Sequence, residues 1–159
     1  DEGEAAHLLS QLVDGLCYMR ARRILHRDIK PPNLLLVHGR DGSPHAPATP
    51  PPSRPRLLIG DFGLARALEP SQMARTVCGS PLYMAPEVLQ ERCHYDGKAD
   101  VYSATMVLWF WLSGEAPFNG IAGDLVALMA AGENLRPSLK NIKIPRTTKP
   151  LCKKLFAEA

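Results

Sequence analysis

The sequence predicts an α+β fold that is mainly helical and contains one small β-hairpin. Residues 5–21 and 98–112 have the apolar patterns of two helices, and the short apolar runs at 33–37 and 56–60 have the length of paired strands. The 159 residues, of which 45% are hydrophobic, suffice for one buried core. A chain that is disordered throughout is excluded, because disorder requires low hydrophobicity and high net charge.

The first predicted helix spans about residues 5–21. Its apolar residues recur with the spacing of one helical face, and they are Leu8, Leu9, Leu12, Val13, Leu16 and Met19. We expect this face to pack against the core.

The two predicted strands, Asn33-Leu-Leu-Leu-Val37 and Arg56-Leu-Leu-Ile-Gly60, flank a proline-rich segment. Six of the 15 prolines lie between residues 44 and 55. Proline removes backbone donors and favours polyproline II, so residues 38–55 are interpreted as an exposed loop inserted into the hairpin. A PxxP-type docking site within residues 44–55 is the alternative to a tolerated insertion.

Residues 98–112 have few polar positions on any face, which is typical of a helix that is buried all round. Further helices are predicted at 122–131 and from Pro150 to Ala159. The longest apolar run, Ala104 to Leu112, is far shorter than the ~20 residues of a membrane-spanning helix, so we expect no membrane span.

Charge and cysteine content narrow the classes of partner. The net charge of +3 is too small by itself to indicate nucleic acid. The basic segment from Arg136 to Lys154 has no interleaved aromatic residues, which favours a solvated loop over a nucleic-acid or acidic-substrate site.

The four cysteines form no CxxC pair, and the acidic start does not resemble a signal peptide. Both features favour free thiols in a reducing compartment, and we expect a cytoplasmic protein.

Three short strings point to chemistry by their order. His26-Arg-Asp-Ile-Lys-Pro-Pro-Asn33 follows the first predicted helix, and Asp61-Phe-Gly63 follows the second predicted strand. Gly79-Ser-Pro-Leu-Tyr-Met-Ala-Pro-Glu87 comes third and precedes the buried helix. A single string of this kind occurs by chance in many proteins, but the three in this order resemble the signature set of the eukaryotic protein kinase family.

This resemblance implies a protein-kinase-like fold, of which the chain covers the mainly helical C-lobe. The glycine-rich loop, strand lysine, helix glutamate and hinge of a kinase N-lobe have no counterpart in these residues. We therefore expect residues 1–159 to be a partial kinase domain that lacks its N-lobe, with a loop insertion at 38–55. We also expect this piece alone to be inactive.

The resemblance assigns roles in the transfer of the γ-phosphate of ATP to Ser or Thr of protein substrates. Asp28 is the carboxylate that accepts the proton of the substrate hydroxyl. Lys30 contacts the transferred phosphoryl group and indicates serine/threonine rather than tyrosine specificity. Asn33 and Asp61 bind Mg²⁺, since their oxygen atoms are hard ligands that suit a hard cation. Leu35 forms the floor beneath the adenine.

Regulatory and substrate-positioning residues carry over from the same resemblance. Arg27 is expected to pair with a phosphate on the activation loop, which runs from Asp61 to Glu87. Thr76 is the candidate phosphosite; an exposed loop threonine without a regulatory role is the alternative. Ser80 is expected to bridge Asp28 and Lys30.

Three other residues are expected to act by packing or anchoring. His26 and Phe62 fit two positions of the hydrophobic spine of the kinases. Asp100 is expected to cap the buried helix while it bonds to the backbone of residues 26–28.

Within the kinases, Val77–Val88 and Tyr95–Asp100 look most like the autophagy-initiating ULK kinases, which implies a role in autophagy initiation. A non-catalytic, pseudokinase-like binding module is the alternative from another class, and a fragment of a longer kinase is a third reading. The intact set of Asp28, Lys30, Asn33 and Asp61 favours an enzyme over a binding module.

Overall fold

The computed structural model describes residues 2–37, 55–68, 74, 78–89, 96–123, 125–126, 129, 132 and 135–138. In chain order, with η marking short 3-10 turns, its elements are α1 (Glu2–Ala21), β1 (Ile24–Leu25), η1 (Pro31–Asn33), β2 (Leu34–Val37), β3 (Arg56–Ile59), η2 (Phe62–Leu64), β4 (Arg66–Ala67), η3 (Pro81–Tyr83), α2 (Pro86–Leu89) and α3 (Lys98–Ser113). The mainly helical character with a small antiparallel sheet, predicted from the sequence, is confirmed.

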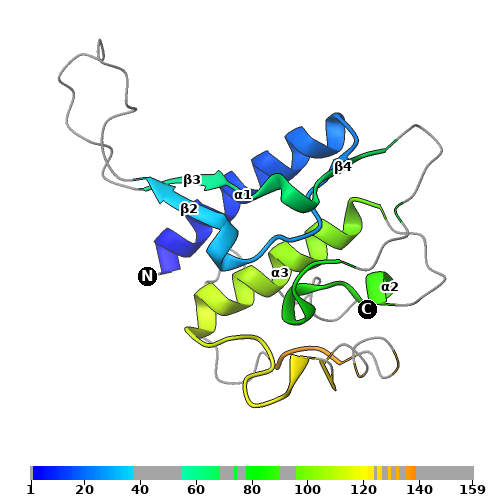
Figure 1. Cartoon of the computed structure of the whole chain (residues 1–159). Helices are drawn as coiled ribbons and strands as arrows, with labels where there is room; N and C mark the ends of the chain where they lie inside the picture. The colour runs from blue at the N-terminus through cyan, green and yellow to red at the C-terminus, as the bar shows by residue number, and fades with distance from the viewer. Residues whose placement is uncertain are drawn as a thin grey trace, which may run out of the picture.

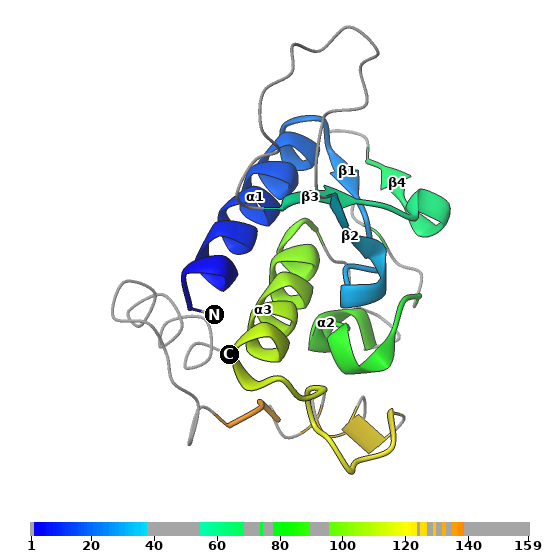
Figure 2. The same ribbon diagram turned by 90° about the vertical axis from the view of Figure 1, so that its left-hand side faces the viewer.

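Helices α1 and α3 lie side by side, and the β2–β3 hairpin packs against both (Figures 1 and 2). The apolar face of α1 contributes Leu8 and Leu12 to a core cluster that also holds residues from the loop before β2, from the hairpin and from α3, namely Ile29, Leu34, Leu57, Ala104 and Val107. Because this one cluster joins four elements, it fixes the hairpin and the loop that precedes it against the helices.

Truncation of Leu12 tests the importance of this cluster. Leu12 is 0% exposed, so Leu12→Ala is expected to lower the free energy of unfolding by about 2–4 kcal/mol through lost burial and a residual cavity. The neighbouring Val13 is 43% exposed and serves as the matched control, for which Val13→Ala is expected to cost less than ~0.5 kcal/mol. Chemical denaturation of both variants measures the difference; equal losses would contradict the assignment of the core.

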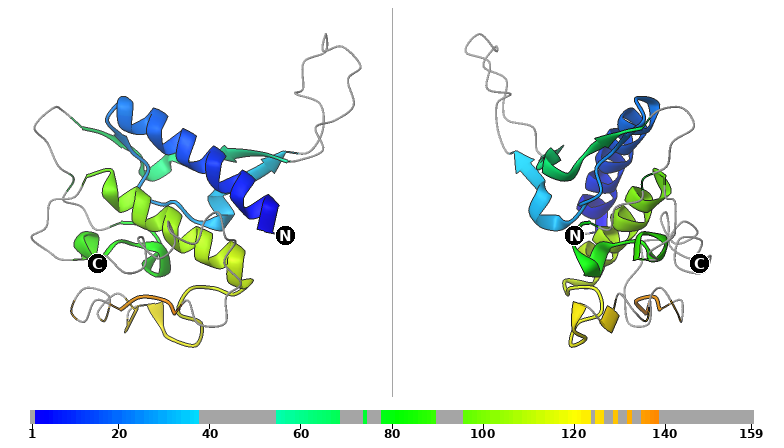
Figure 3. Two further views of the ribbon diagram at one scale, coloured as in Figure 1. Left: turned by 180° about the vertical axis from the view of Figure 1, so that it is seen from behind. Right: turned by 45° about the vertical axis from the view of Figure 1, so that its right-hand side comes forward.

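The β2–β3 hairpin has the predicted strands and an antiparallel register that pairs Leu34 with Ile59 and Val37 with Arg56. The start of β3 is anchored to α1, because the Gln11 side-chain oxygen accepts from the Leu57 amide (3.0 Å) and the Gln11 side-chain nitrogen donates to the Pro55 carbonyl (3.2 Å). Leu34 and Leu57 face the core, whereas the alternate residues of each strand face away from it. Figure 3 shows the hairpin from two further sides.

A second two-stranded sheet, absent from the sequence-based prediction, joins β1 and β4 antiparallel, with Ile24 opposite Ala67. Each strand has only two residues, which is too short for a periodic signal. This sheet fixes the chain on both sides of the hairpin, because β1 precedes the loop to β2 and β4 follows η2.

Helix α3 is buried over most of its length, as predicted, with Val101 as a half-exposed exception. It ends at Ser113 and is capped by Gly114, whose φ of 77° is left-handed and whose amide donates to the Phe110 carbonyl at 2.8 Å. The prediction of Asp100 as its N-cap is wrong: Gly97 occupies that position, and Asp100 lies in the first turn.

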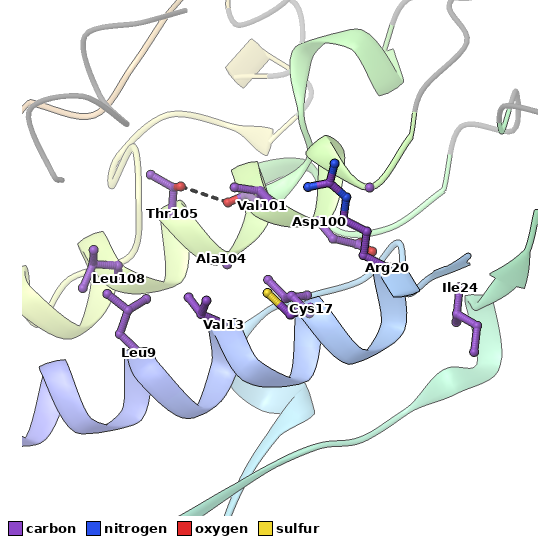
Figure 4. A pocket seen from close by; sticks show the side chains of 12 residues that line it. Leu9, Val13, Cys17, Arg20, Ile24, Asp100, Val101, Ala104, Thr105 and Leu108 are labelled. Carbon is purple, nitrogen blue, oxygen red and sulfur yellow. Dashed lines mark hydrogen bonds between the residues drawn. The ribbon is translucent and has the colours of Figure 1, made fainter. Parts of the chain in front are cut away.

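A groove of about 180 Å³ opens between α1 and α3. Figure 4 shows Val13 and Cys17 of α1 facing Ala104 and Val101 of α3 across it. The sequence places Val13 on the core-facing side of α1, but the residue lines this groove instead. The groove is distinct from the signature strings, because no residue of 26–33 or 61–63 lines it.

Several predictions fall largely outside the described residues. Within the predicted helix 122–131, the described positions 123, 125, 126 and 129 are helical. Residues 38–54 of the proline-rich loop, with the proposed PxxP site, lie outside the described ranges, as does the predicted helix from Pro150 to Ala159. The same holds for the basic segment beyond residue 138. No helix within the described ranges is long and apolar enough to cross a bilayer.

Candidate active site

The loop of residues 26–33, which includes η1 and joins β1 to β2, is anchored to α3 by one buried carboxylate. The two oxygens of Asp100 accept hydrogen bonds from the backbone amides of His26 (2.8 Å) and Arg27 (2.9 Å). Arg27 has a φ of 70°, a left-handed conformation that a non-glycine residue rarely adopts. Asp100 therefore holds the 26–33 loop in a backbone conformation that it would not take up freely.

Burial raises the pKa of Asp100 above its usual value, although the bonds from His26 and Arg27 act in the opposite direction. Its side chain is only 4% exposed. A buried carboxylate is stable in a fold only when hydrogen bonds replace its hydration, and these two amides supply them. The expected bond to the backbone of residues 26–28 is present at 26 and 27.

Four predicted site residues meet around Asp28, and we call them the Asp28 cluster: Asp28, Lys30, Asn33 and Ser80. The Lys30 ammonium lies 2.8 Å from Asp28 Oδ2 and donates to Ser80 Oγ at 2.8 Å. Ser80 Oγ in turn donates to Asp28 Oδ1 at 3.0 Å. The Asn33 amide nitrogen donates to the Asp28 carbonyl (2.8 Å) and to Asp28 Oδ2 (3.1 Å). The cluster thus joins two segments that are about fifty residues apart in sequence.

Two opposing effects act on the charge of Asp28. Burial, which leaves the residue 8% exposed, raises its pKa, but the hydrogen bonds from Lys30, Ser80 and Asn33 and the positive charge of Lys30 together bring the pKa below its usual value. The carboxylate is therefore ionised at neutral pH and able to accept a proton. The adjacent ammonium of Lys30 is able to offset negative charge on a bound group.

The lowered pKa of Asp28 determines how this residue's contribution to folding stability depends on pH. Because the folded state holds the Asp28 carboxylate ionised more strongly than the unfolded state does, the group adds stability above its unfolded pKa near 3.8. That contribution is lost as the pH falls through the folded pKa.

Asn33 and Asp61 lie at the ends of neighbouring strands of the hairpin. The Gly60 amide donates to the Asn33 carbonyl at 2.8 Å, which continues the β2–β3 ladder by one residue and places Asp61 next to it. Asp61 is exposed, has a left-handed φ of 57°, and accepts from the Gly63 amide at 3.3 Å. One amide oxygen and one carboxylate form a donor set that fits Mg²⁺.

The predicted packing residues surround this arrangement. The His26 ring lies edge-on to Phe62 with ring centroids 4.8 Å apart, and His26 Nε2 donates to the Gly60 carbonyl at 2.9 Å. The latter bond requires a proton on Nε2. Leu35 is 53% exposed on the face of β2 that points away from the core. An apolar side chain in this position is able to contact the flat face of a bound ring.

Arg27 donates from Nε to the Leu64 carbonyl at 2.6 Å, so it contacts the residue that follows the Asp61-Phe-Gly63 string. The phosphosite candidate Thr76 lies outside the described residues, and its pairing with Arg27 stays a prediction.

Cys17 and Cys78 are free thiols. The described residues contain no group of three or more His, Cys, Asp or Glu side chains arranged as a metal centre.

Sequence reasoning did not identify Ser103 as a supporting residue. Its hydroxyl donates to the Tyr83 carbonyl at 2.7 Å and so joins η3 to α3, close behind the segment that carries Ser80. The available signal was a polar residue in the middle of an otherwise apolar helix.

Comparison with known proteins shows the family of the chain. Residues 1–158 match the family described as the protein kinase domain. The chain is 39% identical over 155 residues to the serine/threonine-protein kinase atg1 of Dictyostelium discoideum. The aligned residues make up 98% of this chain and 20% of that protein. The chain is 40% identical over 153 residues to human serine/threonine-protein kinase ULK1. The aligned residues make up 94% of this chain and 13% of that protein.

A third relative is the serine/threonine-protein kinase ATG1a of Arabidopsis thaliana, 44% identical over 119 residues, or 75% of this chain and 17% of the relative. The chain therefore belongs to the protein kinase family. It spans no more than about a fifth of the length of these relatives.

Proposed function

We propose that these residues form the C-lobe of a serine/threonine protein kinase, and that the natural protein transfers the γ-phosphate of ATP to Ser or Thr of protein substrates. The observation that carries this proposal is the Asp28 cluster, in which an ionised carboxylate, an ammonium and a serine hydroxyl lie within 3.0 Å of one another. The names of the three relatives support the choice of serine and threonine.

In the proposed reaction, Asp28 orients the substrate hydroxyl and accepts its proton while the hydroxyl oxygen forms a bond to the γ-phosphorus. The bond between that phosphorus and the bridging oxygen of ATP breaks, and ADP leaves. Lys30 lies beside Asp28 and offsets the negative charge on the transferred phosphoryl group. Ser80 holds both side chains in place, since it accepts from one and donates to the other.

Asn33 and Asp61 are the residues that would hold Mg²⁺. Asn33 uses its amide nitrogen on Asp28, which makes its amide oxygen the atom suited to a cation. Mg²⁺, when bound with ATP, neutralises negative charge on the phosphates. Leu35, on the outer face of β2, is the proposed contact of the adenine.

We further propose a cytoplasmic role in autophagy initiation with regulation through Thr76 and Arg27. The role is supported by the resemblance of Val77–Val88 to the ULK kinases and by identity to kinases named atg1 and ULK1. Regulation is supported by the contact of Arg27 with the Leu64 carbonyl, at the start of the activation loop.

A peptide assay tests the activity. The natural protein, with any segments that flank residues 1–159, is incubated with ATP, Mg²⁺ and three matched peptides that carry Ser, Thr or Tyr at one position. We expect phosphorylation of the Ser and Thr peptides, and its loss when EDTA removes the metal. Equal phosphorylation of the Tyr peptide would contradict the specificity, and no phosphorylation of any peptide would favour a non-catalytic binding module.

The metal-binding role of Asp61 gives a separate prediction. Asp61→Asn replaces a charged oxygen ligand with a neutral one, so the Mg²⁺ concentration that gives half-maximal rate is expected to rise about tenfold or more. Asp14, an exposed aspartate on α1, is the control, and Asp14→Asn is expected to leave this concentration unchanged. A titration with Mg²⁺ at fixed ATP measures both; an unchanged value for Asp61→Asn would exclude Asp61 as a ligand.

A further inference from the structure

Gly79 makes an unusually close backbone contact with the 26–33 loop. A β-carbon built at Gly79 would lie 2.4 Å from the Arg27 carbonyl oxygen and 3.7 Å from Asp28 Oδ1. The contacted atom at 2.4 Å belongs to the backbone, so no side chain is able to rotate away. Gly79 also has a φ of 114°, which residues with a β-carbon rarely adopt.

Two other glycines separate the effect of the backbone conformation from that of the contact. Gly114 and Gly120 also have positive φ values, 77° and 86°, but a β-carbon at either would meet no atom within 4 Å. Substitution there strains the backbone without displacing a neighbour. Gly79 is therefore distinguished by the surface against which it packs.

That surface leads directly to the Asp28 cluster through Ser80. An ordinary contact between a β-carbon and an oxygen needs at least about 3.4 Å, so a side chain at 79 would push the segment away by roughly 1 Å. Ser80 Oγ lies 3.0 Å from Asp28 Oδ1, and an added displacement of that size breaks the hydrogen bond.

We propose that Gly79 is a positioning residue, whose missing side chain sets the approach of residues 78–80 to the 26–33 loop so that Ser80 reaches Asp28 and Lys30. This inference rests on the proposed function. It assigns Gly79 no contact with substrate or nucleotide. Its effect passes through Ser80 and is confined to the catalytic step.

The experiment compares Gly79→Ala, Gly120→Ala, Ser80→Ala and the double variant Gly79→Ala/Ser80→Ala in the natural protein. Gly79→Ala is expected to lower kcat by about 10²-fold with the KM for ATP within twofold, because misplacement by about 1 Å is costly to an aligned reaction. Gly120→Ala is expected to keep kcat within twofold. The double variant is expected to be no slower than the slower of its two parents.

Each outcome bears on the proposal. Unchanged kcat for Gly79→Ala, or additive losses in the double variant, would overturn it. If Gly79→Ala fails to fold while Gly120→Ala folds, the clash is supported and Ser80→Ala decides: a kcat defect at constant KM supports the proposal, and full activity overturns it.

Hydrogen exchange separates this inference from the proposed function. Residues 26–33 are expected to exchange faster in Gly79→Ala than in the wild type, with no change in Gly120→Ala. If the wild type transfers no phosphate, the proposed function fails and exchange alone decides: an equal rate in all three proteins overturns the close contact.

Discussion

Asp28→Asn is expected to lower kcat for peptide phosphorylation by about 10²–10⁴-fold, the usual contribution of a positioned general base. The substitution keeps the shape of the side chain but removes its charge and most of its basicity. It also takes away the negative partner of Lys30 and replaces one of the two oxygens that accept from Ser80 and Asn33 with a hydrogen-bond donor. Steady-state kinetics with a Ser peptide measure the loss, and the KM for ATP is expected to change little.

Asp14→Asn is the matched control for this experiment, because Asp14 is an exposed aspartate on α1. It is expected to retain the wild-type kcat. If Asp28→Asn kept more than about a tenth of the wild-type rate, the assignment of Asp28 as the base would be wrong.

Asp100→Ala is expected to lower the free energy of unfolding by about 3–5 kcal/mol, since one buried and one partly buried amide lose their acceptor and each loss costs about 1–3 kcal/mol. The amides belong to His26 and Arg27, so the 26–33 loop should also lose its alignment and kcat should fall with stability. Asp100→Asn keeps one acceptor and is expected to fall between the wild type and Asp100→Ala. Urea denaturation and the peptide assay together measure the two effects.

Glu115→Ala provides the control on stability, because Glu115 is exposed just beyond the end of α3 and such substitutions usually change stability by less than ~0.5 kcal/mol. A loss of less than about 1 kcal/mol for Asp100→Ala would contradict the anchoring of the loop.

The pH dependence offers a second check on Asp100. Its pKa is raised by burial, so ionisation costs folding stability as the pH rises from the unfolded value near 3.8 through the folded pKa. Asp100→Asn should lack this decline. The sign is opposite to that expected for Asp28.

The helices and the hairpin were predictable because each has apolar residues in a run or pattern long enough to be recognised in the sequence. Six apolar residues defined α1, and two apolar runs with flanking Pro and Gly defined β2 and β3. The β1–β4 sheet was not predictable, since strands of two residues pair only because the rest of the fold brings them together. The exposure of Val13 likewise depends on how α1 and α3 pack, which periodicity does not specify.

The residues that meet at the candidate site, and the bridge from Ser80 to Asp28 and Lys30, were predictable from the family resemblance, whereas their catalytic roles stay predictions. The order of the three sequence motifs led to the prediction of Asp28, Lys30, Asn33 and Ser80 as site residues. The role of Asp100 was predicted only in part. Asp100 does bond to the loop, but its position in the first turn of α3 leaves the N-cap to Gly97. The close approach at Gly79 had no sequence signal beyond the glycine itself, because a backbone contact between distant segments exists only in the folded chain.

The most direct test of the proposed kinase activity identifies the residue that receives the phosphate. The natural protein and its Asp28→Asn variant are each incubated with γ-labelled ATP, Mg²⁺ and a mixed protein substrate, and the labelled amino acids are separated after hydrolysis. The expected result is label on phosphoserine and phosphothreonine with the wild type and almost none with the variant. Label on phosphotyrosine alone, or equal label from both proteins, would contradict an Asp28-dependent serine/threonine kinase.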